Sequence, residues 1–280
     1  MYAFVLTTFN DADNAIKAYK SLLDTIPLDS TYKIVVVDAG SRPEERQKLE
    51  ANFGTVIGPY EHLSDALNAG IYNALGYSHD NIQEFVKTGN TGCDHVFWIH
   101  TDMLFFQWDW ARKLINIYEH LWPLVGRLAP GTSNIDNTYA QLNQGIGIGH
   151  SNNCPWVIGK DYIRNTVAKY GHVYNPAFTK IGGAEDHDTW FRILDDGMFV
   201  CVTYLVDVVH KGMGNRGTRD TMQEQIHNRE VFHRIWGQNI FPKIDFDLKD
   251  VNTELMEKFG YLKDEVLSLN EIKDKLAKEL

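Results

Sequence analysis

The distribution of apolar residues along the chain alternates between short, continuously apolar runs and longer stretches with helical spacing. Apolar runs of strand length lie at 3–9, 32–41 and 95–103, and each ends in polar residues. Continuous apolar runs are typical of strands that are covered on both faces by helices. Residues 12–24 and 63–75, which lie between these runs, have the spacing of helices. The order strand, helix, strand predicts βαβ units and an α/β fold with a mostly parallel central sheet.

The second half of the chain has a less regular pattern. The segment 143–153 is rich in Gly and Asn and predicts a loop, whereas 155–171 predicts a strand followed by a helix. The apolar run 198–210 predicts a last strand that ends at His210. From about residue 241 the pattern indicates a linker and one or two amphipathic helices. We therefore expect one domain over residues 1–240 and a C-terminal helical appendage over 241–280.

Composition and charge narrow the functional classes. The 280 residues are 44% hydrophobic and carry a formal charge of −10, which fits a globular protein and argues against non-specific nucleic-acid binding. A local basic segment nevertheless contains Lys211, Arg216 and Arg219. The three cysteines are far apart, and no apolar run approaches the roughly 18 residues of a membrane span. These features predict a cytoplasmic protein without a signal peptide or transmembrane segment.

Polar side chains at the ends of the predicted strands are the first candidates for ligand binding. In open α/β sheets, ligands bind beyond the C-terminal ends of the strands. The residues at these ends are Thr7, Thr8, Asp38, His100 and Asp102. Asp38 has two interpretations, because the following Ala-Gly also fits an Asx turn, in which the carboxylate binds its own backbone.

Two of the candidates suit a metal ion. Asp102 is an acid between apolar runs, and a buried carboxylate requires a partner, either a structural one or a divalent cation. His210 ends the last apolar run, directly before the basic segment. Its imidazole fits either a satisfied strand-end histidine or a metal ligand, and Lys and Arg beside glycines can hold a diphosphate.

The stretch GGAEDHDTWFRIL, residues 182–194, begins a helix with more acids than a helix start needs. Asp188 and Arg192 are four residues apart and are expected to pair on one helical face. From the sequence we expect no local partner for Glu185 and Asp186, although the helix dipole favours acids in a first turn. His187 is left open, either as part of an acceptor site or as a solvent-facing side chain.

Taken in order, these segments resemble the inverting nucleotide-diphosphosugar glycosyltransferases of the GT-A fold, the large family that includes polysaccharide synthases. LTTFND resembles the first strand and nucleotide loop of that family, and VVVDAGS its V-V-D-D-G-S motif. LSDALNAGIYNAL is similar to the helix with an A-x-N-x-G-I core, and WIHTDM stands in the place of the D-x-D motif. EDHDTWFRILDDG is similar to the E-D-x-D-L-x-x-R signature. His100 replaces the first acid of D-x-D, and DAGS lacks the second acid of D-D-G-S.

The resemblance implies roles for these residues. Asp102 and His210 would bind Mn²⁺ or Mg²⁺, and Asp186 would be the general base, with Glu185 contacting the acceptor or orienting that base. The donor, expected to be a UDP-sugar, would be contacted by a larger set: Thr7, Thr8, Asp38, Asn68, His100, Thr101, Lys211, Arg216 and Arg219.

The acceptor is left open by the sequence. Glycans, small molecules and hydroxymethylated cytosine of phage DNA are the alternatives, and the negative charge counts against DNA. A nucleotidyltransferase would need a glycine-rich phosphate loop with a basic residue, which TTFNDADN lacks. An inactive sugar-nucleotide-binding module would have lost its acids. The C-terminal helices are candidates for forming a homo-oligomer.

Overall fold

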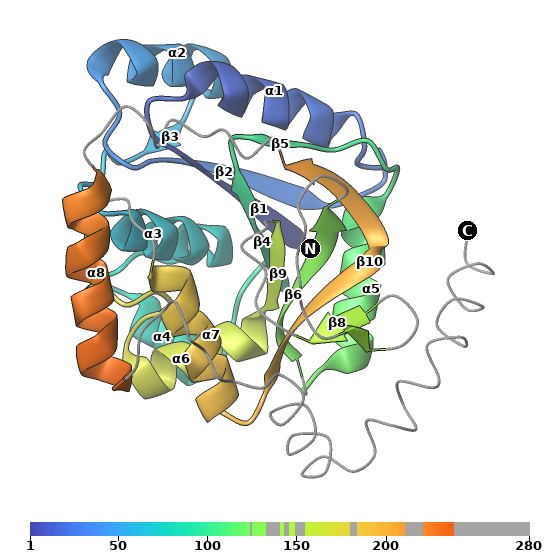
Figure 1. Cartoon of the computed structure of the whole chain (residues 1–280). Coiled ribbons are helices and arrows are strands. Elements are labelled where there is room, and N and C mark those ends of the chain that lie inside the picture. The colour runs from blue at the N-terminus through green and yellow to red at the C-terminus, as the bar shows by residue number, and fades with distance from the viewer. Residues whose placement is uncertain are drawn as a thin grey trace.

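The computed structural model describes residues 1–123, 125–132, 141–142, 146–148, 155–179, 184–210 and 221–237. In this part of the chain a ten-stranded sheet forms the centre, in the order β3-β2-β1-β4-β9-β6-β10-β8-β7, with β5 paired to β10. Helices α1 and α2 lie on one side of β1–β3, and α3 lies on the other side (Figure 1). The α/β class with helices on both faces, expected from the sequence, is confirmed.

The N-terminal half of the sheet is parallel. β1 (Tyr2–Thr8) pairs with β2 (Tyr32–Asp38) on one side and with β4 (His95–His100) on the other, and β3 (Val56–Ile57) extends the edge beyond β2. The apolar runs explain this arrangement, because every side chain of β1 is buried and must be covered on both faces.

Strands that run in both directions complete the other half. β9 (Trp156–Gly159) is antiparallel to β4 and to β6 (Val125–Thr132). The long strand β10 (Phe199–His210) runs parallel to β6 and antiparallel to β8 (Ile146–Ile148). The loop expected over 143–153 is therefore wrong at 146–148, where the backbone pairs with β10. The remaining two strands are β5 (Met103–Leu104) and β7 (Gln141–Leu142).

The helices expected from periodicity are present, and others are added. α1 (Ala12–Leu23), α3 (Leu63–Leu75), α6 (Lys160–Tyr170) and α7 (Glu185–Asp195) confirm the expected segments. The additional helices are α2 (Pro43–Phe53), α4 (Ile82–Thr88), α5 (Trp110–Leu121) and α8 (Thr221–Trp236). Residues 238–280 lie outside the described part, so the proposed domain boundary and the oligomerising helices stay predictions.

Two residues of the α3 motif fix this helix on the sheet. A Cβ atom added at Gly70 would lie 2.4 Å from Cγ1 of Val5 and 2.9 Å from Cγ2 of Val37, so only glycine lets the helix approach β1 and β2 this closely. Asn68 points elsewhere: its Nδ2 donates to the Tyr174 carbonyl at 2.7 Å, and its Oδ1 accepts from the Val173 and Tyr174 amides. Asn68 thereby ties α3 to the segment after α6.

Candidate functional site

The candidate site lies where the strand order changes direction along the sheet. β1 has β2 on one side and β4 on the other, so the loops that follow these strands leave the sheet at the same edge, where ligands bind in open α/β sheets. The parallel register places Thr8 beside Asp38 and Thr7 beside His100 at this edge. The strand-end residues expected to meet from the sequence therefore do so.

His100, Asp102 and His210 form a compact set of possible metal ligands. One ligand atom from each residue can be chosen so that all lie within 4.8 Å of one another. Nε2 of His210 lies 3.1 Å from Oδ1 of Asp102. The antiparallel pairing of β5 with β10 produces this proximity, because it sets His210 opposite Met103, the residue after Asp102. The two residues expected as metal ligands are thus brought together, and His100 joins them.

Asp102 is held as a carboxylate. Burial acts to raise its pKa, but the hydrogen bond from His210 and the charges of His100 and His210 outweigh burial and lower the pKa to about 2. Asp102 is only 7% exposed. An ionised carboxylate beside two imidazoles is a donor set that suits Mn²⁺ and also accommodates Mg²⁺.

A second buried acid at this edge of the sheet, Asp11, was not among the sequence candidates. Its Oδ2 accepts a hydrogen bond from Thr101 at 2.6 Å, and its Oδ1 accepts one from Asn14 at 2.8 Å. Burial raises the pKa of Asp11 and the nearby Asp102 charge adds to this, against the two hydrogen bonds. The sequence signal was available, because Asp11 follows the first strand within LTTFND. Thr101, which the sequence predicts to contact the sugar donor, therefore links the loop after β4 to the loop after β1.

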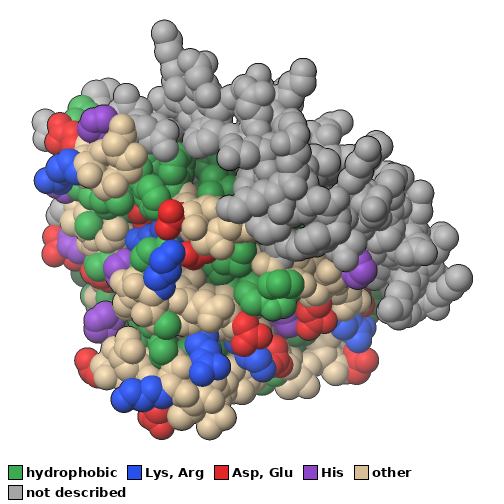
Figure 2. Space-filling model, turned by 90° about the horizontal axis from the view of Figure 1, so that it is seen from below, with side chains coloured by type: hydrophobic (Ala, Val, Ile, Leu, Met, Phe, Trp, Pro, Cys, Tyr) green, Lys and Arg blue, Asp and Glu red, His purple; other side chains and the backbone are tan. Residues whose placement is uncertain are grey.

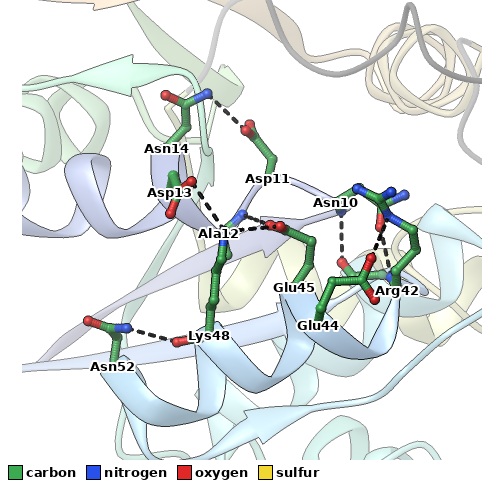
Figure 3. Close-up of polar contacts among 11 residues, drawn as sticks. Asn10, Asp11, Ala12, Asp13, Asn14, Arg42, Glu44, Glu45, Lys48 and Asn52 are labelled. Carbon is green, nitrogen blue, oxygen red and sulfur yellow. Dashed lines mark hydrogen bonds and ion pairs between the residues drawn. The ribbon is translucent and has the colours of Figure 1, made fainter.

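The loops after β1 and β2 are locked together, as Figure 3 shows. The Asn10 amide donates to Oγ of Ser41 at 2.8 Å, and the Arg42 amide donates to Oδ1 of Asn10 at 2.7 Å. Oε2 of Glu45 accepts from the Ala12 amide at 3.0 Å, which satisfies a free donor at the start of α1. These reciprocal hydrogen bonds hold the loops after β1 and β2 together at this edge of the sheet.

The side chains of Asp38 and Thr7 form hydrogen bonds within the protein. Oδ1 of Asp38 accepts the Ser41 amide, three residues on, at 2.8 Å, so the carboxylate binds its own loop as the turn interpretation expected, and Oδ2 lies 3.3 Å from Nη1 of Arg46. Asp38 is fully buried. The indole N–H of Trp98 donates to Oγ1 of Thr7 at 2.8 Å. Donor contacts by Asp38, Thr7 and Thr8 stay predictions.

The remaining donor candidates divide into two groups. The polar atoms of Asn68 bind the backbone at Val173 and Tyr174, so we leave Asn68 out of the proposed donor contacts. Lys211, Arg216 and Arg219 lie outside the described residues, and their expected role at the diphosphate stays a prediction.

The acidic start of α7 separates into structural and candidate catalytic groups. Asp188 pairs with Arg192 as expected, and its Oδ1 accepts from the Trp236 indole at 2.9 Å, which anchors α8. Glu185 is buried, and its Oε2 accepts the Ala184 amide at the helix start. Asp186 is 17% exposed in its side chain, as is His187. Of the acids in this turn, Asp186 is therefore the one that solvent or an acceptor can reach.

A chain of aromatic contacts connects the metal-ligand set toward α7. Trp98 lies edge-on to His100, with ring centroids 4.6 Å apart, and to Trp156, at 4.7 Å. The buried guanidinium of Arg127 stands 3.5 Å above the Trp156 ring. Its positive charge also acts on His187 of α7. The packed residues of β4, β9 and β6 thus connect the possible metal ligands toward α7, which carries the candidate base.

No family model matches the sequence, and no curated protein matches it significantly. Solved structures do resemble its fold. Glucosyl-3-phosphoglycerate synthase from Mycobacterium tuberculosis, solved with Mg²⁺ and uridine diphosphate, aligns with 86% of this chain and 80% of its own at 12% identity and a TM-score of 0.51. A mannosyltransferase from Pyrobaculum calidifontis, solved with GDP-Man and Mn²⁺, aligns with 99% of this chain and 80% of its own at 15% identity and a TM-score of 0.50. The fold is that of GT-A nucleotide-sugar glycosyltransferases.

Among the helices of the described residues, none combines the length and the apolar character needed to cross a bilayer.

Proposed function

We propose that this protein is a metal-dependent glycosyltransferase that moves a sugar from a nucleotide-diphosphosugar, expected to be a UDP-sugar, to an acceptor hydroxyl. The observation that carries the proposal is the meeting of His100, Asp102 and His210 at the C-terminal edge of a sheet with this fold. The solved proteins of the same fold act on sugar donors, and their structures contain Mg²⁺ or Mn²⁺.

The donor set fits a divalent cation. Asp102 supplies a carboxylate oxygen whose low pKa keeps it ionised, and His100 and His210 supply imidazole nitrogens. Bound there, Mn²⁺ or Mg²⁺ would neutralise charge on the leaving diphosphate. The aromatic packing of Trp98 against His100 holds that imidazole in place. Thr8, at the same edge, is proposed to face the nucleotide, and Asp38 to hold the adjoining turn through the Ser41 amide.

Asp186 is proposed as the general base. It takes the proton of the acceptor hydroxyl as the acceptor oxygen forms its bond to the anomeric carbon, while the bond from that carbon to the diphosphate oxygen breaks. A positioned base of this kind typically contributes about 10²–10⁴-fold to the rate. A single displacement with the base opposite the leaving group inverts the anomeric configuration. Glu185 supports the helix start from which Asp186 projects.

The experiment that tests the donor and metal is a thermal-shift panel. UDP-glucose, GDP-mannose and a TDP-sugar are added with and without Mn²⁺ to wild type and to Asp102→Asn. Ligand bound only to the folded protein at about 100 times its Kd stabilises it by about 2.7 kcal/mol. We expect a Mn²⁺-dependent rise in Tm for one donor, lost in Asp102→Asn. A wild-type protein that no donor stabilises with Mn²⁺ would contradict the proposal.

The chemistry is tested separately. Asp186→Asn removes the base but keeps the size of the side chain, so we expect donor binding to persist and transfer to fall at least about 100-fold. NMR of the product's anomeric carbon should show inversion, and retention would refute the displacement. Glycan, small-molecule and hydroxymethylcytosine acceptors are compared in the same assay. A nucleotidyltransferase would instead release pyrophosphate from a nucleoside triphosphate and a sugar phosphate, and an inactive module would bind donor without turnover.

A further inference from the structure

We propose that His187 is a positioning residue that orients the carboxylate of Asp186 and sets its basicity through its own protonation. This inference rests on the proposed function, because it concerns the base of the same reaction. It assigns a role to a residue for which the sequence offered two open interpretations.

The geometry shows two donors directed at one oxygen. Oδ1 of Asp186 accepts the backbone amide of His187 at 2.9 Å, and Nδ1 of His187 lies 2.9 Å from the same Oδ1. Because both contacts are made to Oδ1, they fix the orientation of the Asp186 carboxylate. A base held by a third group is the usual arrangement in nucleophile-activating sites.

Helix stability does not account for an imidazole at this position. His187 lies in the first turn of α7, where the helix dipole disfavours a positive charge by about 0.3–1 kcal/mol. The side chain is also largely buried, with 17% of its surface exposed, and burial opposes its charged form. In this turn the imidazole of His187 contacts the carboxylate of Asp186.

The charges around His187 come from two elements. On α7 the carboxylates are Asp186 and Glu185, and on β6 the guanidinium is Arg127. Burial, the largest influence, lowers the pKa of His187, as does Arg127, but the charge of Asp186, its hydrogen bond and the charge of Glu185 together raise it above the ordinary value. The imidazolium therefore persists to a higher pH than in a free histidine.

The protonation state of His187 changes the strength of the base. Below the pKa of His187, Asp186 is paired with a cation and is a weak proton acceptor. Above it, the neutral imidazole still donates its Nδ1–H and keeps the carboxylate oriented, while Asp186 becomes more basic. Transfer should therefore accelerate as the pH rises through this pKa.

Three variants separate these roles. His187→Asn places an amide N–H close to the position of Nδ1 and cannot ionise, whereas His187→Ala removes the donor. His120→Asn, at an exposed position of α5, is the matched control. Turnover of UDP-glucose and GDP-mannose with Mn²⁺ is measured between about pH 5 and 9, the range in which imidazoles titrate. The ring signals of the histidines are titrated by NMR in wild type and Asp186→Asn.

We expect His187→Ala to slow turnover about 10-fold or more, and His187→Asn to restore much of the rate while losing the acidic limb of the pH profile. In Asp186→Asn the titration of His187 should shift to lower pH. An unchanged rate and pH profile in both His187 variants, or an unmoved titration, overturns the inference. Should Asp186→Asn keep full turnover, the proposed base itself fails, which is a distinct result. Thermal melts of each variant show whether a lost rate reflects unfolding.

Discussion

Replacing Gly70 with alanine should destabilise the protein, although alanine is the better helix former. Gly70 lies inside α3, where glycine costs about 1 kcal/mol relative to alanine. Helix propensity alone would therefore predict a more stable variant. The packing predicts the opposite, because the new methyl group would lie 2.4 Å from Cγ1 of Val5 and 2.9 Å from Cγ2 of Val37.

The magnitude follows from these contacts. Carbon atoms in a packed core prefer separations of about 3.5–4.0 Å, so the helix or the strands must move by about 1 Å. Val5 and Val37 are fully buried and branched at Cβ, so neither can turn its side chain away without a clash. Overpacking costs about 1–3 kcal/mol, and a contact as short as 2.4 Å belongs to the upper part of that range, about 2–3 kcal/mol, which exceeds the gain of about 1 kcal/mol in propensity. A net loss of about 1–2 kcal/mol lowers Tm by about 2–8 °C in a chain of this size.

Thermal and urea denaturation of Gly70→Ala, Val5→Ala and the double variant measure the effect. Val5→Ala removes the atom nearest to the new methyl group, so the double variant should be more stable than the sum of the single changes predicts, by about 1 kcal/mol or more. A Gly70→Ala protein that melts at or above the wild-type temperature, or a zero coupling with Val5→Ala, would refute the reasoning.

Three further predictions concern the elements around the site. Asn68→Ala leaves backbone groups at the segment after α6 unpaired, so it should cost about 1–3 kcal/mol in urea denaturation and leave donor affinity unchanged; a selective loss of donor binding would restore Asn68 to the donor contacts. Asp188→Ala removes the carboxylate from the buried Arg192 and should destabilise by about 3–5 kcal/mol, with a smaller loss in Asp188→Asn, and equal melts for the two would contradict this role. Burial and the charges of Arg192 and His79 lower the pKa of His172 to about 4. Between these pH values the imidazole is protonated in the unfolded chain but neutral in the folded protein, so the free energy of unfolding should fall as the pH drops from about 6.5 to about 4. His172→Gln removes the titrating group and should flatten this dependence. A wild-type midpoint that is constant over this range would be inconsistent with a half-buried neutral imidazole.

The sequence predicts those elements best whose own periodicity decides their structure. The expected helix 63–75 is observed as α3 with the same bounds, because its apolar face is wide and nearly all of it is buried. α2 was missed for the opposite reason. Its sequence PEERQKLEANF is strongly polar and buries only Leu49, so it has almost no periodic signal. β8 was also missed, because its short Gly-rich strand gains its structure from pairing with β10.

In the candidate site, too, some features could be predicted from the local sequence and others depend on contacts with distant segments. Asp102 and His210 could be selected as metal ligands because each is a polar residue that ends an apolar run. Their contact depends on the pairing of β5 with β10, and a ladder of two residues has no signature in the sequence. Asn68 illustrates the converse case, because its place in a recognisable motif suggests a ligand contact, whereas the structure shows it bound to backbone groups far along the chain.

The late position of β10 also has a consequence for synthesis. A nascent chain that has emerged only through α5 holds β1, β2 and β4, and with them His100 and Asp102. The third candidate ligand is the imidazole of His210 at the end of β10, and this strand must pair with β6 and β5 before His210 reaches its neighbours. The three candidate ligands therefore cannot meet until the chain has been synthesised beyond residue 210 and β10 has joined the sheet.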